Sequence, residues 1–215
     1  MRSRAILIAG LIIALALAAA FGWLAWQVEG GRSAAFDSHV RNVVHSWSNP
    51  ALTRAMKVMS FIGEPYVIWP LLCAAIVVLQ RAHLNGWLLA IAMTGEVCIE
   101  QTLKFTFRRP RPSPFFGYPE PSSYSFPSGH ALGSLVFFGT LAALVAPRIR
   151  STAAQGLLWI ATALLVGAIG FSRVYLGVHY PTDVIGGYAA ALVWVIAVAL
   201  GDHAKKRRIE RYNER

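Results

Sequence analysis

The chain has 215 residues, of which 56% are hydrophobic and 14% are charged, and its mean hydropathy is +0.50. These values exclude an ordinary water-soluble domain and are typical of a protein that crosses a membrane several times. The net charge of +10 would suit nucleic-acid binding, but the basic residues lie between apolar runs and cluster only in the segment Lys205 to Arg215. We therefore expect no nucleic-acid partner, and we interpret this segment as a cytoplasmic cluster attracted to anionic lipid.

Six apolar stretches reach, with their flanks, the length of about 20 residues that a helix needs to cross the hydrocarbon core. A span in lipid must satisfy its own backbone hydrogen bonds, so each stretch is predicted to be a helix. The sequence thus predicts an all-α fold, a six-transmembrane helix bundle that forms a single domain over residues 1–215. The stretches are Ala5 to Trp26, Pro65 to Gln80, Trp87 to Phe105, Ala131 to Ala146, Ala153 to Phe171 and Val184 to Leu200.

The first stretch also has features of a signal peptide, namely a basic start and small residues near a possible cleavage point. Its uninterrupted apolar length favours an uncleaved membrane anchor.

Six crossings place both termini on one side of the membrane. That side would carry eleven of the 20 lysines and arginines, six of them in the C-terminal cluster. The positive-inside rule therefore predicts cytoplasmic termini, with the first, third and fifth connections facing outward.

The first outer connection contains two helical patterns. Apolar residues from Phe36 to Trp47 recur at helical spacing, and Asn49-Pro50 is typical of a cap and first turn before a second helix, Ala51 to Phe61. These patterns predict short interfacial helices, which would form either a lid near a site or a simple packing layer on the bundle.

Three polar clusters lie at the outer ends of the predicted spans. The third span ends at Lys104, and Arg108, Arg109 and Arg111 follow in a turn with several prolines. Such cations suit either an anion site or an anchor to lipid headgroups, and we favour anchoring for Arg108 and Arg109.

The second cluster, Pro127-Ser128-Gly129-His130, stands where the fourth span begins. Gly129 lets a ligand approach the backbone closely, and the first N–H groups of a helix bind anions. The alternative is an ordinary helix cap with an incidental histidine.

The third cluster comprises Arg173, His179 and Asp183 between the fifth and sixth spans. A carboxylate four residues after an imidazole accepts its N–H and fixes its tautomer, so the other ring nitrogen is available as a nucleophile or base. A salt-bridged helix cap is the alternative.

All three clusters lie on the same face of the membrane. A site with several cations, a helix N-terminus and two histidines suits an anionic substrate with a transferable centre, and phosphate fits best.

These residues resemble the three-part signature of the type 2 phosphatidic acid phosphatase superfamily. The matching blocks, which span residues 104–183 in the family's order, are Lys104-x6-Arg111-Pro112, Pro127-Ser128-Gly129-His130 and Ser172-Arg173-x5-His179-x3-Asp183.

The resemblance implies roles for eight residues. His179 would attack phosphorus and form a phosphohistidine, Asp183 would hold its ring, and His130 would protonate the leaving group and then activate water. The phosphoryl oxygens would be held by Lys104, Arg111, Ser128, Gly129 and Arg173. The family requires no metal or other cofactor.

The resemblance also implies a membrane lipid phosphatase of the bacterial type, in an inner (plasma) membrane. The predicted orientation turns its site toward the periplasm or exterior. Its substrates would be undecaprenyl diphosphate, which we favour, phosphatidylglycerophosphate or phosphatidate. The alternatives are a lipid phosphotransferase that uses the same intermediate and a non-catalytic lipid-binding protein of the same fold.

Two acidic residues interrupt the third span. Buried carboxylates in a membrane helix need partners. Glu100 lies one turn before Lys104, so either it pairs with that lysine or it makes a structural hydrogen bond between helices, and for Glu96 we favour the second interpretation.

Overall fold

The computed structural model describes residues 2–213, including all their side chains except those of residues 2–4, 211 and 213. Every regular element in this part of the chain is a helix, which confirms the predicted all-α class. The elements are α1 (Arg2–Glu29), α2 (Ala34–Ser46), α3 (Pro50–Ile62), α4 (Pro65–Arg81), α5 (Gly86–Phe107), α6 (Gly129–Ser134), the π-helix η1 (Leu135–Gly139), α7 (Thr140–Val145), the 3-10 helix η2 (Ala146–Arg148), α8 (Thr152–Tyr175) and α9 (Pro181–Asn213).

Four helical segments of the described chain are long and apolar enough to cross a membrane. They are Ala5–Glu29, Gly129–Arg148, Thr152–Tyr175 and Pro181–Glu210, and α3 with α4, bent by 51°, would make a fifth. α5 falls outside this set because Glu96, Glu100 and Lys104 lower its hydropathy. The integral membrane character is clear, whereas the number of six crossings stays a prediction.

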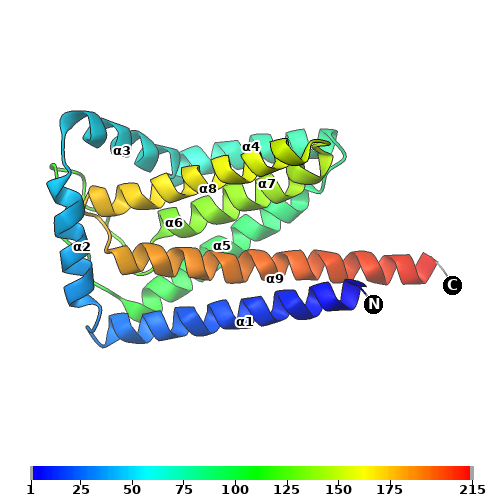
Figure 1. Cartoon of the computed structure of the whole chain (residues 1–215), viewed down its shortest axis with the longest axis horizontal. Coiled ribbons are helices and arrows are strands. Elements are labelled where there is room, and N and C mark those ends of the chain that lie inside the picture. The colour runs from blue at the N-terminus through cyan, green and yellow to red at the C-terminus, as the bar shows by residue number, and fades with distance from the viewer. Residues whose placement is uncertain (1, 214–215) are drawn as a thin grey trace.

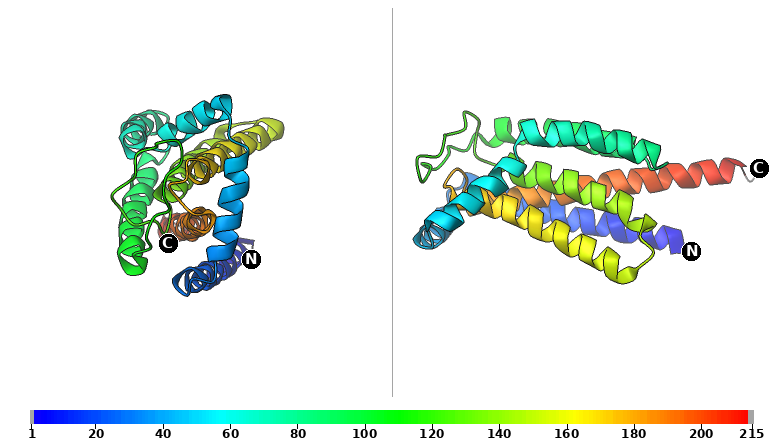
Figure 2. Two further views of the ribbon diagram at one scale, coloured as in Figure 1. Left: turned by 90° about the vertical axis from the view of Figure 1, so that its left-hand side faces the viewer. Right: turned by 90° about the horizontal axis from the view of Figure 1, so that it is seen from above.

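The helices form an elongated bundle with both described chain ends at the same end (Figure 1). α1 and α9 lie side by side along its length, and α2 crosses the opposite end (Figures 1 and 2). α8 ends and α9 begins at that opposite end, so the connections carrying the three polar clusters meet there (Figure 1).

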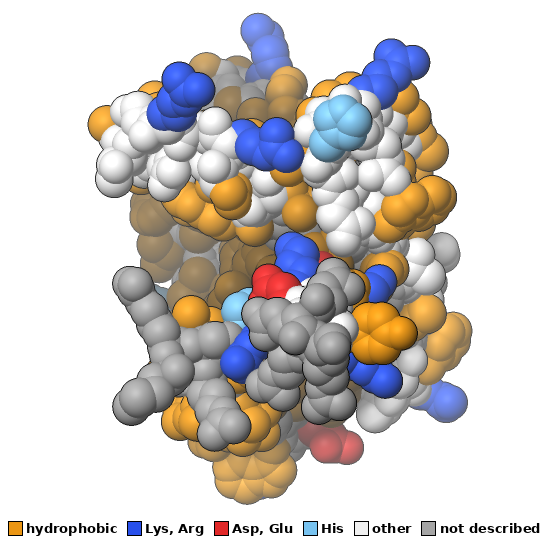
Figure 3. Space-filling model, turned by 90° about the vertical axis from the view of Figure 1, so that its right-hand side faces the viewer, with side chains coloured by type: hydrophobic (Ala, Val, Ile, Leu, Met, Phe, Trp, Pro, Cys, Tyr) orange, Lys and Arg blue, Asp and Glu red, His pale blue; other side chains and the backbone are white. Residues whose placement is uncertain are grey.

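Exposed basic side chains gather at the end of the bundle that holds the termini (Figure 3). They include Arg81, Arg148, Arg150, Lys205 and Lys206. The predicted basic cluster at 205–215 is thus the final part of α9, although residues 214 and 215 lie outside the described part of the chain. Large apolar side chains of α1, such as Ile8, are exposed along the flank, as lipid contact requires.

The first outer connection folds into the two predicted helices, α2 and α3. The side chain of Asn49 caps α3 by accepting a hydrogen bond from Leu52 N at 2.9 Å, and Pro50 occupies the first turn, where no N–H is needed. α3 and α4 are separated only by Gly63 and Glu64.

Close packing against α5 and α9 fixes the position of α6, the first part of the predicted fourth span. Leu89, Leu132 and Ala191, one from each helix, are fully buried in a shared apolar cluster. A side chain at Gly187 of α9 would come within 2.7 Å of the Ser128 carbonyl oxygen, so the glycine permits the close approach of the two helices.

Candidate active site

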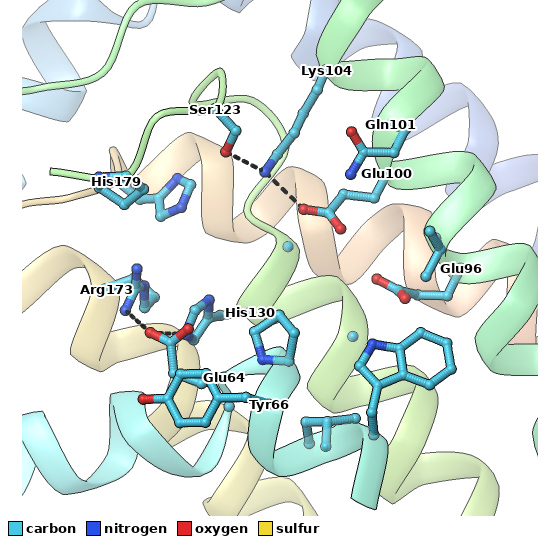
Figure 4. Close-up of a pocket in the computed structure, with 18 of the residues that line it drawn as sticks. Glu64, Tyr66, Glu96, Glu100, Gln101, Lys104, Ser123, His130, Arg173 and His179 are labelled. Atoms are coloured by element: carbon cyan, nitrogen blue, oxygen red, sulfur yellow. Dashed lines mark hydrogen bonds and ion pairs between the residues drawn. The ribbon is translucent and has the colours of Figure 1, made fainter. Parts of the chain in front are cut away.

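A cavity of about 530 Å³ opens at the end of the bundle away from the termini, between α4, α5, α6 and α8. Six of the eight predicted site residues line it, although they come from three separate parts of the sequence: Lys104, Arg111, Gly129, His130, Arg173 and His179. The other two, Ser128 and Asp183, are fully buried. The structure therefore brings all three clusters to one place (Figure 4).

His179 lies in the short connection between α8 and α9 and is 1% exposed. Its Nε2 lies 3.0 Å from Arg111 Nη1, and its Nδ1 lies 3.4 Å from Asp183 Oδ2. A guanidinium can only donate, so Nε2 is the acceptor and the ring proton sits on Nδ1, facing the carboxylate. Burial lowers the pKa of His179 to about 3, and Asp183 offsets only part of that effect. The ring is neutral, with the Nε2 lone pair on the cavity side.

Asp183 is held by several donors besides His179. Its carboxylate accepts hydrogen bonds from Ser125 Oγ at 2.5 Å, from the backbone N–H of Tyr180 at 2.8 Å and from Arg109 Nη1 at 2.6 Å. Each oxygen has a partner, so the carboxylate cannot rotate away from the imidazole without losing these bonds.

Arg109 links Asp183 to a second buried carboxylate, Asp37 of α2. Arg109 Nη2 lies 2.7 Å from Asp37 Oδ2, and Thr182 donates to Asp37 from both its backbone N–H and its hydroxyl. Burial alone would lower the pKa of Arg109, but the charges of Asp183 and Asp37 raise it above its ordinary value. The expectation that Arg109 anchors α5 to headgroups is therefore wrong. Sequence reasoning missed Asp37, whose only signal is an acidic residue within an amphipathic helical pattern.

His130 lies in the first turn of α6 and faces Glu64, a second residue that sequence reasoning missed. Its Nε2 is 3.3 Å from Glu64 Oε1, which is also 3.8 Å from Arg173 Nη1. Glu64 reaches this position because Gly63 leaves room, since a Cβ there would come within 2.9 Å of the His130 ring. The Gly-Glu-Pro break between two helical patterns was the available signal.

Three cations surround the space between the two histidines. Lys104 Nζ pairs with Glu100 Oε1 at 2.7 Å, which is the first of the two alternatives left open for Glu100, and it donates to Ser123 Oγ at 3.1 Å. Burial, followed by the nearby charge of Arg173, lowers the pKa of Arg111 to about 10, so it stays charged at neutral pH. Arg173 donates to Ser60 Oγ on α3.

Three buried polar atoms near this space have no hydrogen-bond partner among the described residues: Ser128 Oγ, Arg173 Nε and His130 Nε2, whose 3.3 Å approach to Glu64 is an ion-pair contact and not a hydrogen bond. Buried polar groups are almost always paired, and those without a partner in a protein structure are commonly met by a ligand or water. The position of these donors among the cations fits the oxygens of a bound anion.

The geometry permits transfer of a phosphoryl group. A neutral histidine held by a carboxylate provides a nucleophile, and a second histidine next to a carboxylate provides a proton donor. Arginine and lysine side chains are the usual stabilisers of phosphoryl charge.

Known proteins share this sequence pattern and fold. The family model described as PAP2 superfamily matches residues 85–207. The chain is 28% identical over 161 residues to phosphatidylglycerophosphatase B of Bacillus subtilis. The alignment covers 74% of this chain and 79% of that protein. It is 33% identical over 150 residues to decaprenylphosphoryl-5-phosphoribose phosphatase of Mycolicibacterium smegmatis. That alignment covers 64% of this chain and 72% of the relative.

The crystal structure of a transmembrane PAP2-type phosphatidylglycerolphosphate phosphatase from Bacillus subtilis has the same fold. It matches with a TM-score of 0.82 at 24% identity, over 89% of this chain and 96% of that one. Because the family model covers more than half of the sequence, the chain belongs to the PAP2 superfamily.

Proposed function

We propose that this protein is a membrane lipid phosphatase that works through a phosphohistidine on His179, with no metal. The observation that carries the proposal is the convergence of His179, His130 and three cations around one cavity. The relatives named above are phosphatases of lipids, or of lipid-linked groups, which supports a substrate of the same kind.

In the first step, His179 Nε2 forms a bond to phosphorus while the bond from phosphorus to the leaving oxygen breaks. His130 gives its proton to that oxygen, so the leaving group departs as a neutral alcohol or a protonated phosphate. Glu64, 3.3 Å from His130 Nε2, favours the protonated imidazole that this step requires.

In the second step, neutral His130 takes a proton from water, whose oxygen bonds to phosphorus as the nitrogen–phosphorus bond breaks. Inorganic phosphate leaves and both histidines return to their starting states. Arg111 would move from Nε2 to a phosphoryl oxygen when substrate binds, which frees the nucleophile and places a cation on the developing charge.

The membrane placement follows from the distribution of charge. We propose that α5 also crosses the bilayer, that α4 crosses with α3 lying in the interface, and that the termini are cytoplasmic. The exposed basic residues at the end that holds the termini support this orientation, which turns the cavity toward the exterior or periplasm.

The test is phosphate release by the purified protein in detergent from a panel of lipid phosphates and diphosphates, with and without EDTA. We expect activity that the chelator does not change. His179→Ala should abolish turnover, and His130→Ala should bind substrate but form phosphohistidine about 100-fold more slowly or worse, because general acids typically contribute that much.

His39→Ala is the matched control, since His39 is exposed on α2. It should keep the activity of the parent protein. Full activity in His179→Ala, or loss of activity on adding EDTA, would contradict the mechanism.

A further inference from the structure

Glu96 and Glu100 are two carboxylates of the cavity wall that the proposed chemistry does not use. They lie one helical turn apart on α5, and both line the cavity. Glu96 is 4% exposed and makes no hydrogen bond to any described residue, so the bond between helices that the sequence favoured for it is absent there. Glu100 differs, because its carboxylate contacts two of the residues that are expected to hold phosphate.

The Glu100 carboxylate lies against both Lys104 and Gly129. Its Oε1 is 2.7 Å from Lys104 Nζ, and the two side chains point toward each other on one side of the cavity (Figure 4). The same oxygen fills the place of a side chain at Gly129, since a Cβ added there would overlap it. The close approach to Gly129 that the sequence assigned to a ligand is thus made by an anion of the protein itself.

A phosphoryl group bound by Lys104 would meet this carboxylate. An ammonium has three N–H donors, and in Lys104 one of them serves Glu100 and one serves Ser123, so one remains for a phosphoryl oxygen. Two anions on one ammonium repel each other, and inside a cavity this repulsion is screened less than in bulk water. Bound phosphate must either displace Glu100 from Lys104 or stay beside its charge, and both outcomes weaken the binding.

Weak binding of free phosphate suits the last step of the proposed reaction. When the nitrogen–phosphorus bond has broken, inorganic phosphate lies among Lys104, Arg111 and Arg173, and these cations together favour keeping it in the cavity. A lipid substrate also has its chain, whose contacts add binding energy that free phosphate lacks. A weakened phosphate subsite therefore lets the product leave while the lipid still binds.

We propose that Glu100 is a resident anion of the phosphate subsite, which competes with inorganic phosphate for Lys104 and so speeds product release. The proposal rests on the phosphatase function above and concerns its final step. The alternative is that Glu100 only positions Lys104 and thereby helps it to bind phosphate. The two roles predict opposite changes in phosphate affinity when the carboxylate is removed.

The test is the dissociation constant of inorganic phosphate, measured by calorimetric titration of the purified protein in detergent at neutral pH. Glu100→Gln keeps the size of the side chain and removes its charge. We expect it to bind phosphate about tenfold more tightly than the parent protein, because like charges placed together in a binding site cost at least that much affinity. During turnover of a lipid phosphate, inorganic phosphate should inhibit this variant at a correspondingly lower concentration.

Glu100→Ala is a second variant, which removes the carboxylate without filling its space. It should shift both constants in the same direction, so the result does not depend on the folding of one variant. Unchanged or weaker phosphate binding in a folded Glu100 variant would assign Glu100 to positioning alone and overturn the proposal.

Glu120→Gln is the matched control, because Glu120 lines the same cavity, is exposed and forms no ion pair with a described residue. It removes the same charge and should leave the affinity for phosphate within about twofold of the parent value. Failure of the phosphatase function itself would look different, since the parent protein would then release no phosphate from any lipid and His179 would carry no phosphoryl group.

Discussion

At the scale of single residues, one arginine connects the proposed nucleophile, through Asp183, to helix α2 at the end of the bundle. Arg109 is 13% exposed in its side chain and bridges Asp183, which orients His179, to Asp37, which is anchored by Thr182. A guanidinium suits this place because two carboxylates can each take a different edge of the planar group. We therefore assign Arg109 a positioning role, because it acts on His179 through Asp183.

Arg109→Ala should lower both stability and activity. Two buried carboxylates would lose their shared cation, which costs about 3 kcal/mol of unfolding free energy when one partner of a buried pair is removed. With Asp183 less firmly held, kcat should fall about 10- to 100-fold, the loss typical when the hydrogen-bond partner behind a metal-binding histidine is removed, while KM changes little. Thermal unfolding in detergent and single-turnover formation of phosphohistidine measure the two effects.

Arg109→Lys and Arg108→Ala separate positioning from general loss of charge. Lysine keeps the charge but cannot bridge both carboxylates with the same geometry, so it should restore stability more than kcat. Arg108 is exposed and its Nε donates to the Phe105 carbonyl, so its removal should change neither quantity. An Arg109→Ala protein with the kcat of the parent would refute the positioning role.

The site residues that can be predicted from the sequence are those marked by residues next to them in the chain. The histidines and cations at 104–183 stand beside prolines and glycines that end helices, and the spacing from His179 to Asp183 already implies contact. Asp37 has no such neighbours, and its partners Arg109 and Thr182 are 72 and 145 positions away in the sequence. Glu64 does stand in a Gly-Glu-Pro break, but nothing near it in the sequence points to His130 as its partner. Only the packing of α2 and of the α3–α4 corner against the bundle brings them to the site, and periodicity within one segment does not encode that packing.

At the scale of elements, the corner between α3 and α4 positions Glu64 beside His130. Gly63 has an ordinary φ of −84°, so its backbone would accept any residue. The constraint is space, because a Cβ would come within 2.6 Å of Ile169 Cγ2 and 2.9 Å of His130 Cδ2.

Gly63→Ala should therefore push the corner away from α6 and α8. Overpacking of this kind costs about 1–3 kcal/mol of unfolding free energy. The displaced Glu64 should also slow the step that needs protonated His130. Thermal unfolding and phosphohistidine formation are the measurements.

Gly22→Ala is the matched control, because Gly22 lies within helix α1 and has nothing within 4 Å of its would-be Cβ. It should be neutral or slightly stabilising, since alanine favours a helix. If the two variants behave alike, the packing of the corner does not constrain the site.

The apolar stretches predicted the helices well, and the exception has a physical cause. α5 coincides with the expected third span, but its second half carries Glu96, Glu100 and Lys104 facing the cavity. Polar residues that line the cavity thus lower the hydropathy by which a membrane helix is recognised. A helix that carries polar cavity residues can therefore cross the membrane and still have a low hydropathy, so the number of crossings cannot be counted from hydropathy alone.

At the scale of the whole molecule, the cavity and the exposed basic residues near the chain ends lie at opposite ends of the bundle. The connection 108–128 and the beginning of α6 lie at the cavity end, whereas the chain ends and the connection before α8 lie at the other (Figure 1). A lipid phosphate presented at the outer headgroup layer would reach the cavity without moving its chain across the bilayer.

This separation predicts opposite accessibility for two engineered cysteines. Ser122 is exposed in the connection at the cavity end, and Ala153 is exposed at the beginning of α8 at the other end. In a background where Cys73 and Cys98 are replaced by alanine, an impermeant maleimide added to sealed right-side-out vesicles should label Ser122→Cys at once. Ala153→Cys should react only after detergent opens the vesicles, because the proposed orientation places the basic end in the cytoplasm. The reverse pattern would place the cavity on the cytoplasmic side and require substrate from the inner leaflet.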